Sequence, residues 1–296
     1  MVSYVNEFEN YLRDVKKSSK NTLESYMRDV AKFIVYCGEK RLKDPSAVTS
    51  EFVTKYEQYM LSVGQSESSV ARTVASLRCY FNFLVKENYL STTPVVTLSK
   101  RTTPKKLPEI LTSKEVITLL EQPSGNDYKS CRDKAMLELL YATGIRVTEL
   151  IELKVSDLNL QIGVIHMSGD KKKDRIIPLY PQALKTIKHY VTEARPVMIS
   201  DPDEERLFTN MSGQPMTRQG FWKIIKHYAS AAKINKDITP HTLRHSFAAH
   251  LLENGAQLTD VQELLGHSDI SSTQVYAQMM KNKYAAAYKK FHPLAR

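Results

Sequence analysis

The sequence predicts a mainly α-helical protein of two domains, with one small antiparallel β-sheet in the second domain. At 296 residues the chain is long enough for two compact domains, each with its own core. Apolar residues recur at helical spacing through most of the chain. Short β-branched runs typical of strands are confined to one place, on either side of a polar loop near residue 170.

The N-terminal part is predicted to contain four helices. Apolar residues at helical spacing, separated by polar breaks, cover Tyr4–Val15, Leu23–Val35, Phe52–Val63 and Val70–Val85. The segment that follows is basic, contains prolines and has no periodicity, as linkers do. We therefore expect an N-terminal domain at residues 1–90, a linker at 91–108 and a second domain at 109–296.

The second domain is predicted to be mostly helical around one β-hairpin. Thr112 and Glu115 have the spacing of a helix-capping box, and Gly144 should end a helix that covers Arg132–Tyr141. Strands are expected at Val164–Met167 and Arg175–Leu179, on either side of the polar loop. Further helices are expected at Gln182–Glu193, Arg218–Ala232, Pro240–Glu253, Leu258–Leu265, Ser271–Met280 and Tyr284–Phe291.

The charge of the chain favours a polyanionic partner. The formal net charge is +10, and a basic surface attracts nucleic acid through long-range attraction and counterion release. Residues 1–106 hold 17 Lys and Arg against 11 Asp and Glu, and the remainder holds 25 against 21, so the net charges are +6 and +4. Both halves are basic, as a clamp around DNA requires, although many basic proteins never bind DNA.

The sequence also indicates a cytoplasmic location. No apolar run resembles a signal peptide or is long enough to span a bilayer, so no membrane association is expected. The three cysteines are Cys37, Cys79 and Cys131, an odd number without metal-ligand spacing. This usage fits buried thiols in a reducing compartment better than a disulfide framework.

Arg146 is the first candidate for chemistry. It follows the predicted helix end at Gly144, where its guanidinium and the first amides of a new helix could meet one phosphate. The simpler interpretation is a surface salt bridge between Arg146 and Glu149.

A second group of candidates opens the helix that begins at Pro240. His241 and Arg244 are three residues apart, so they share one helix face and could hold one phosphate. The alternatives are a capping histidine with a solvated arginine, or a metal pair formed by His241 and His245. No HExxH pattern or third carboxylate ligand supports the metal, so we expect no metal or other cofactor.

The last candidates are His267, which follows a helix-ending glycine, and Tyr276, nine residues later. A single tyrosine among the sixteen of this chain is usually a packing residue. Tyr276 is therefore a candidate only together with the other candidate residues.

In sequence and order these residues resemble the tyrosine recombinase family, which includes the phage integrases. The matching set is Arg146, His241, Arg244, His267 and Tyr276. The sequence around these residues is similar to that of Xer-type recombinases in Tyr141–Leu150, Pro240–His245 and Leu264–Ser268. It is most similar to the XerD branch in Arg132–Glu138 and Met216–Gln219. The resemblance covers nearly the whole chain.

The resemblance implies a SAM-like, DNA-binding N-terminal domain and a catalytic C-terminal domain. It implies that Tyr276 attacks a DNA phosphate held by Arg146 and Arg244, with His267 as a further donor and His241 accepting or relaying the tyrosine proton. The hairpin loop departs from the family pattern, because Asp170 stands where a gapless alignment puts the catalytic lysine. We expect Lys171 to be the general acid, while Lys172 and Lys173 stay open.

The resemblance further implies a 3′-phosphotyrosyl intermediate, a Holliday junction, and a tetramer on two double-stranded recombination sites. A XerC-like partner recombinase and a DNA-translocase activator are expected for chromosome or plasmid dimer resolution. The alternatives are a mobile-element integrase, a type IB topoisomerase-like enzyme, and a DNA-binding accessory protein that has lost catalysis. The target DNA sequence cannot be read from the chain, because phosphate contacts carry no sequence information.

Overall fold

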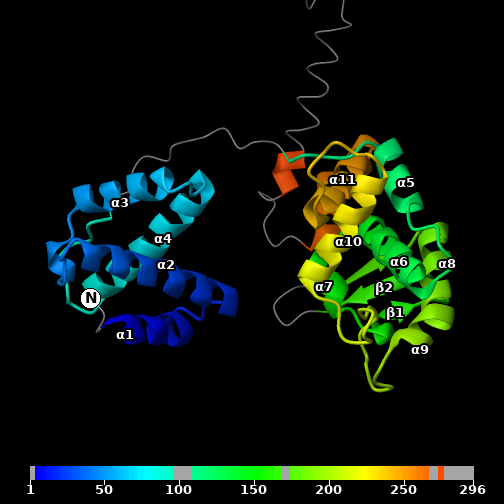
Figure 1. Ribbon diagram of the computed structural model, residues 1–296, viewed down its shortest axis with the longest axis horizontal. Helices are drawn as coiled ribbons and strands as arrows, with labels where there is room; N and C mark the ends of the chain where they lie inside the picture. Colours follow the sequence, from blue (N-terminus) through cyan, green and yellow to red (C-terminus); the bar gives the residue numbers. More distant parts are fainter. Residues whose placement is uncertain (1–3, 96–107, 169–173, 267–272, 277–296) are drawn as a thin grey trace, which may run out of the picture. The chain divides into compact units, whose positions relative to one another are not determined.

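The computed structural model of the chain describes residues 4–95, 108–168, 174–266 and 273–276. The chain divides into two compact units, Met1–Pro104 and Lys105–Arg296, which are described separately (Figure 1). Most of the linker expected at residues 91–108 lies outside the described residues, so its bounds stay a prediction.

The first unit contains the four predicted helices. Helix α1 (Val5–Asn10) continues as a π-helical segment to Val15, and it is followed by α2 (Lys20–Glu39), α3 (Ser50–Ser62) and α4 (Glu67–Lys86). Ser19, Thr49 and Ser66 cap the last three helices by accepting backbone N–H groups with their side chains.

The core of the first unit is rich in aromatic side chains, among them Phe8, Phe33 and Tyr80, all fully buried. Cys37 and Cys79 are buried in the same core as free thiols. The prediction of buried, unpaired cysteines is therefore confirmed for these two, and the free thiol of Cys131 in the second unit is half-buried.

The second unit is mostly helical. Its helices are α5 (Ser113–Glu121), α6 (Tyr128–Thr143), α7 (Val147–Glu152), α8 (Pro181–His189), α9 (Arg195–Met198), α10 (Arg218–Ala231), α11 (Pro240–Glu253) and α12 (Leu258–Leu265). The predicted capping box of Thr112 and Glu115 is present, and Gly144 ends α6 in the left-handed conformation. Residues 273–276 are helical, whereas the rest of the two helices expected after residue 270 lies outside the described residues.

The sheet of the second unit has three antiparallel strands in the order β1 (Leu158–Asn159), β2 (Val164–Met167) and β3 (Arg175–Pro178). The predicted hairpin is confirmed, with Met167 opposite Arg175 where the loop leaves the sheet. Strand β1 was not predicted, since two residues are too few to show alternation.

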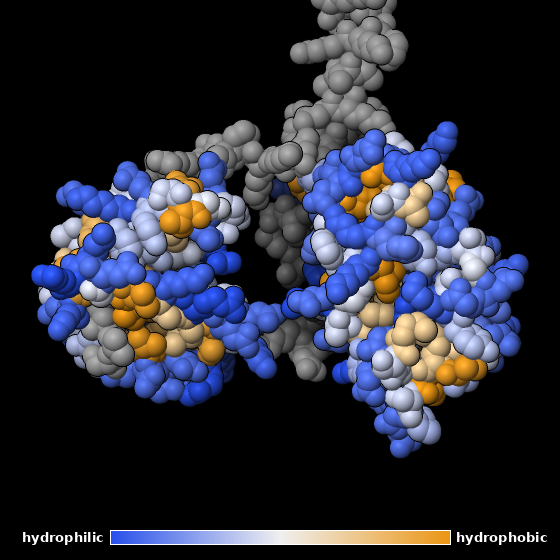
Figure 2. All heavy atoms as spheres, in the orientation of Figure 1, coloured by the Kyte–Doolittle hydropathy of each residue, from blue (hydrophilic) through white to orange (hydrophobic). Residues whose placement is uncertain are grey.

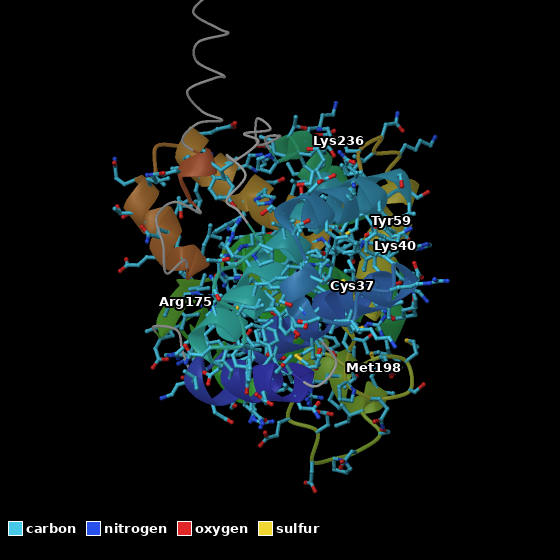
Figure 3. The ribbon with its side chains drawn as sticks, turned by 90° about the vertical axis from the view of Figure 1, so that its left-hand side faces the viewer. Cys37, Lys40, Tyr59, Arg175, Met198 and Lys236 are labelled. Atoms are coloured by element: carbon cyan, nitrogen blue, oxygen red, sulfur yellow. The ribbon has the colours of Figure 1, made fainter. Side chains whose placement is uncertain are left out.

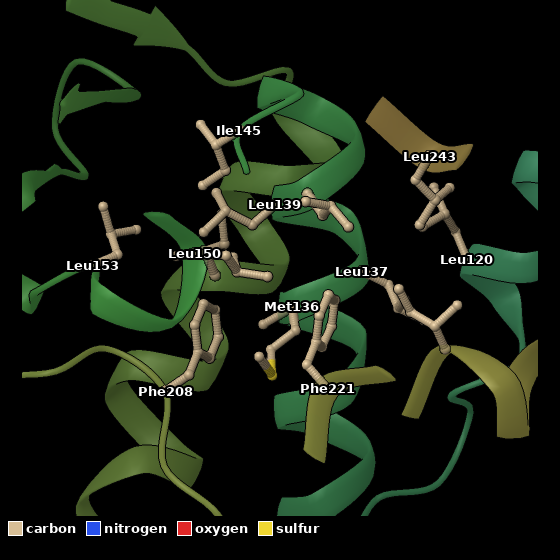
Figure 4. Close-up of a cluster of buried hydrophobic side chains, with 14 of the residues drawn as sticks. Leu120, Met136, Leu137, Leu139, Ile145, Leu150, Leu153, Phe208, Phe221 and Leu243 are labelled. Atoms are coloured by element: carbon tan, nitrogen blue, oxygen red, sulfur yellow. The ribbon is translucent and has the colours of Figure 1, made fainter. Parts of the chain in front are cut away.

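Helix α6 forms the centre of the second unit. It buries side chains around its whole circumference, including Met136, Leu137 and Leu139, and Figure 4 shows them between side chains of the surrounding elements, Phe221 and Leu243 among them. A helix buried on all sides has little freedom to shift within a close-packed core. The end of α6 therefore gives the residues after Gly144 a fixed starting point.

The visible surface of both units is largely hydrophilic, with small separate apolar patches (Figure 2). Over the residues that the structure describes, no helix is long and apolar enough to cross a membrane.

Candidate active site

Arg146 occupies the turn between α6 and α7, where it is the N-cap residue of α7. Its backbone N–H donates to Oε2 of Glu149 at 2.8 Å, and its guanidinium Nη1 lies 3.4 Å from Oε1 of the same carboxylate. The Arg146 side chain is 32% exposed, so part of the guanidinium remains open to solvent. The salt bridge that was the simpler interpretation is thus present, and it fixes a cation that still faces outward.

Arg175, the first residue of β3, is the third member of this network. Its Nη2 lies 3.2 Å from Oε2 of Glu149, and its Nε donates to the carbonyl oxygen of Leu264 at 3.0 Å. The Arg175 side chain is only 9% exposed, and its position is labelled in Figure 3. It joins the base of the hairpin to the beginning of α7 and the end of α12.

Gly266 makes the close approach of Arg175 possible. It ends α12 with a φ of +61°, and a Cβ atom at this position would lie 2.7 Å from Nη1 of Arg175. Only glycine combines this backbone conformation with so short a distance.

Arg244 on α11 is held by backbone carbonyls from two separate elements. Its Nη1 donates to the carbonyl oxygen of Gly144 at the end of α6, and its Nη2 donates to that of Leu265 at 2.9 Å. Burial and the nearby positive charge of Arg146 lower the pKa of Arg244 to about 10, so its guanidinium remains charged at neutral pH. The protein thus holds a buried cation that an anion would stabilise.

His241 and His245 lie one turn apart on α11, with ring centroids 6.4 Å apart. Partial desolvation, followed by the charges of Arg244 and Arg146, lowers the pKa of His241 below its usual value. Burial, followed by His241 and Arg244, lowers the pKa of His245 to about 4. Both imidazoles are therefore neutral at neutral pH, although His241 still reaches the surface.

Tyr276 is 1% exposed and packs with Phe247, Val261 and Leu265. Its hydroxyl oxygen lies 2.8 Å from Nδ1 of His245. Burial raises the pKa of the phenol, while the charges of Arg244 and Arg146 oppose that rise. A neutral phenol next to two guanidinium groups can become a nucleophile once its proton has an acceptor.

The structure therefore brings four of the six predicted site residues into one electrostatic neighbourhood: Arg146, His241, Arg244 and Tyr276. The other two, Lys171 and His267, lie outside the described residues.

Sequence reasoning did not assign site roles to His245, Glu149 and Arg175. The four-residue spacing of His241 and His245 suggested only a pair of metal ligands. Within the described part of the chain, no three His, Cys, Asp or Glu side chains group to hold a metal ion. The three-residue step from Arg146 to Glu149 was a usable signal, because it is the spacing of a capping box. Arg175 gave no local signal, since both of its partners are distant in sequence.

Both units match known protein families in sequence. Residues 109–283 match the Phage integrase family, and residues 5–88 match the phage integrase N-terminal SAM-like domain. The chain is 41% identical to a "Tyrosine recombinase XerD" of Staphylococcus epidermidis and 40% identical to one of Staphylococcus aureus, each over the full length of both chains.

Solved structures of recombinases share the fold. XerA recombinase is 27% identical with a TM-score of 0.56, covering 98% of this chain and 99% of the other. XerH bound to a palindromic difH substrate is 22% identical with a TM-score of 0.75, covering 96% of this chain and 84% of the other. The chain belongs to the phage integrase family and is a tyrosine-type site-specific recombinase of the Xer type, close to XerD.

Proposed function

We propose that this recombinase cuts and rejoins DNA through a 3′-phosphotyrosyl bond to Tyr276, with a Holliday junction between two rounds of strand exchange. The observation that carries the proposal is the buried Tyr276 hydroxyl within the field of two guanidinium groups, Arg146 and Arg244. A phosphodiester resists attack because its negative charge repels nucleophiles, so a site that supplies two fixed cations beside a phenol suits this reaction.

The roles of the other residues follow from the demands of the reaction. Arg146 and Arg244 would hold the non-bridging phosphate oxygens through charge-assisted hydrogen bonds. His241 is expected from the sequence to accept or relay the tyrosine proton; because both arginines lower its pKa, we propose that it also contacts the same phosphate. We keep His267 as a further donor and Lys171 as the general acid that protonates the departing 5′ oxygen.

The biological role that we propose is resolution of chromosome or plasmid dimers at segregation, by analogy with relatives named XerD. The DNA-bound XerH structure and a lambda integrase dimer on its core site support double-stranded DNA as the partner. We infer a tetramer on two sites, with a XerC-like recombinase and a DNA-translocase activator. Because these relatives come from Staphylococcus, bacteria whose chromosome lies in the cytoplasm, we propose that this protein also acts there.

We also propose that the two units grip the duplex together, with the bounds expected from the sequence, 1–90 and 109–296. Their net charges support such a clamp, because each half is basic on its own.

Covalent trapping tests the proposed function. Purified protein mixed with a nicked duplex that carries its recombination site should give an adduct that survives SDS. Tyr276→Phe removes only the hydroxyl and should abolish the adduct. An adduct with the Phe variant would show that the nucleophile is assigned wrongly, and loss of all activity in EDTA would revive the metal pair of His241 and His245.

A further inference from the structure

The hydroxyl of the proposed nucleophile contacts His245, and not the histidine that the sequence favoured. Nδ1 of His245 lies 2.8 Å from the Tyr276 oxygen, and the two rings have centroids 5.6 Å apart at an angle of 54°. His245 lies on α11 one residue after Arg244, whose guanidinium is fixed by two carbonyls. Arg244, which we propose holds the phosphate, and His245, which contacts the proposed nucleophile, therefore lie next to each other on one turn of α11.

The protonation states of His245 and Tyr276 suit transfer of the phenol proton to the imidazole. A neutral imidazole has one nitrogen that accepts a hydrogen bond, and a phenol whose pKa is raised keeps its proton. With Nδ1 as the acceptor, the proton of Tyr276 is directed at His245. The lone pairs of the phenol oxygen are then free for another partner.

We propose that His245 is the proton acceptor for Tyr276 during DNA cleavage and the proton donor during rejoining. This rests on the proposed function, in which Tyr276 is the nucleophile. In cleavage the phenol oxygen forms a bond to phosphorus, the bond from phosphorus to the 5′ oxygen breaks, and the phenol proton moves to Nδ1. The 5′ oxygen takes a proton from the general acid, and rejoining reverses each transfer.

Bound DNA strengthens His245 as a base. In the free protein its basicity is suppressed by burial and by neighbouring positive charge from Arg244. A phosphate between the arginines brings negative charge next to the same imidazole, which favours the protonated form and raises its pKa. His245 thus becomes a stronger base when DNA binds, and the Tyr276 phenol keeps its proton until then.

The arrangement also separates the two histidines by role. His241 stands one turn earlier on α11, and the charges of Arg244 and Arg146 lower its pKa, whereas the contact at 2.8 Å to the Tyr276 hydroxyl is made by His245. It suits a contact to the phosphate, whereas His245 suits proton transfer.

The test uses the full-length protein and a nicked duplex that carries its recombination site. His245→Ala removes the acceptor, and His245→Asn keeps a hydrogen-bond acceptor near the position of Nδ1 but cannot take a proton. The readouts are the single-turnover rate of adduct formation at saturating DNA, the DNA affinity, and the rate with added imidazole. His189→Ala, at an exposed histidine of α8, is the matched control.

We expect both variants of His245 to form the adduct about 10²- to 10⁴-fold more slowly than wild type, with unchanged DNA affinity. Imidazole should restore part of the rate in His245→Ala and should not change His189→Ala. A wild-type rate in His245→Asn would reduce the residue to an orienting role and overturn the proposal. So would an undiminished rate in His245→Ala, which would mean that the contact only restrains the tyrosine, or a complete absence of imidazole rescue.

The outcome can be separated from that of the proposed function. If wild type forms the adduct and Tyr276→Phe does not, Tyr276 is the nucleophile, and fast His245 variants would then overturn only the proton transfer to His245. If wild type forms no adduct, the proposed function itself fails.

Discussion

Glu149 holds Arg146 at two points with one carboxylate. One oxygen accepts the Arg146 backbone N–H at 2.8 Å, and the other lies 3.4 Å from the guanidinium. The first contact fixes where α7 begins, and the second fixes the direction of the cation. Glu149, to which we assign no chemical step, thereby determines the position of Arg146, which we propose holds the phosphate.

Replacing Glu149 should affect stability and cleavage together. Glu149→Ala leaves the nearly buried Arg175 without its carboxylate, and breaking such a pair costs on the order of 3 kcal/mol. We expect a lower unfolding temperature and slower adduct formation at saturating DNA. In Glu149→Gln the side-chain amide oxygen can still accept the Arg146 N–H, so this variant should lose less stability and less activity. Glu193→Ala, at an exposed position, should match wild type in both measurements; equal loss in this control would remove the special role of Glu149.

Much of this fold could be predicted because the signals are local. The beginning of α11 follows from Pro240 as a first-turn residue and the end of α12 from Gly266 as a C-cap, and the bounds of both helices were expected correctly. Arg244 and Tyr276 were identified by their resemblance to a family. The partners that position them could not be found this way, since Arg175 meets Leu264 across 89 positions and Arg244 meets Gly144 across 100. Such contacts depend on tertiary packing, which no local pattern records.

Gly144 should tolerate no side chain. It has a φ of +59°, and a Cβ atom would lie 2.3 Å from Cδ1 of Phe247, while its carbonyl oxygen accepts from Arg244. Backbone strain and overpacking together should cost about 2–4 kcal/mol in Gly144→Ala. Gly255→Ala is the matched control, because Gly255 has a φ of +94° and an added Cβ atom would meet nothing within 4 Å, so this variant carries only the strain. Similar unfolding temperatures for the two variants would contradict the packing argument.

Salt should weaken DNA binding steeply. Both halves of the chain are basic, so a clamp by the two units should neutralise several phosphates and release their counterions. For about 6–10 phosphate contacts, affinity falls about 10³- to 10⁵-fold between 50 and 200 mM salt. A titration of the intact protein should give a straight line in log–log form with a large negative slope. A flat response, or one unit alone binding as tightly as the whole, would exclude the clamp.

The general acid should belong to the hairpin loop. Met167 and Arg175 pair where the loop leaves the sheet, and Arg175 is tied through Glu149 to the residue that we expect to hold the phosphate. The loop residues themselves lie outside the described residues, so the assignment of Lys171 stays a prediction from the sequence. Lys171→Ala should cleave normal DNA slowly, because expelling a 5′ alkoxide without a proton is slow.

A 5′-bridging phosphorothiolate substrate isolates that role, since a thiolate leaves without protonation. Lys171→Ala should regain cleavage on this substrate, whereas Arg244→Ala should not, because the arginine acts on the non-bridging charge. Lys172→Ala and Lys173→Ala are the matched controls and should cleave both substrates like wild type. If Lys172→Ala alone showed the rescue, the acid would lie one residue further along the loop. If none of the three lysine variants showed it, the loop would serve only to contact phosphates, and the proton would come from another part of the site.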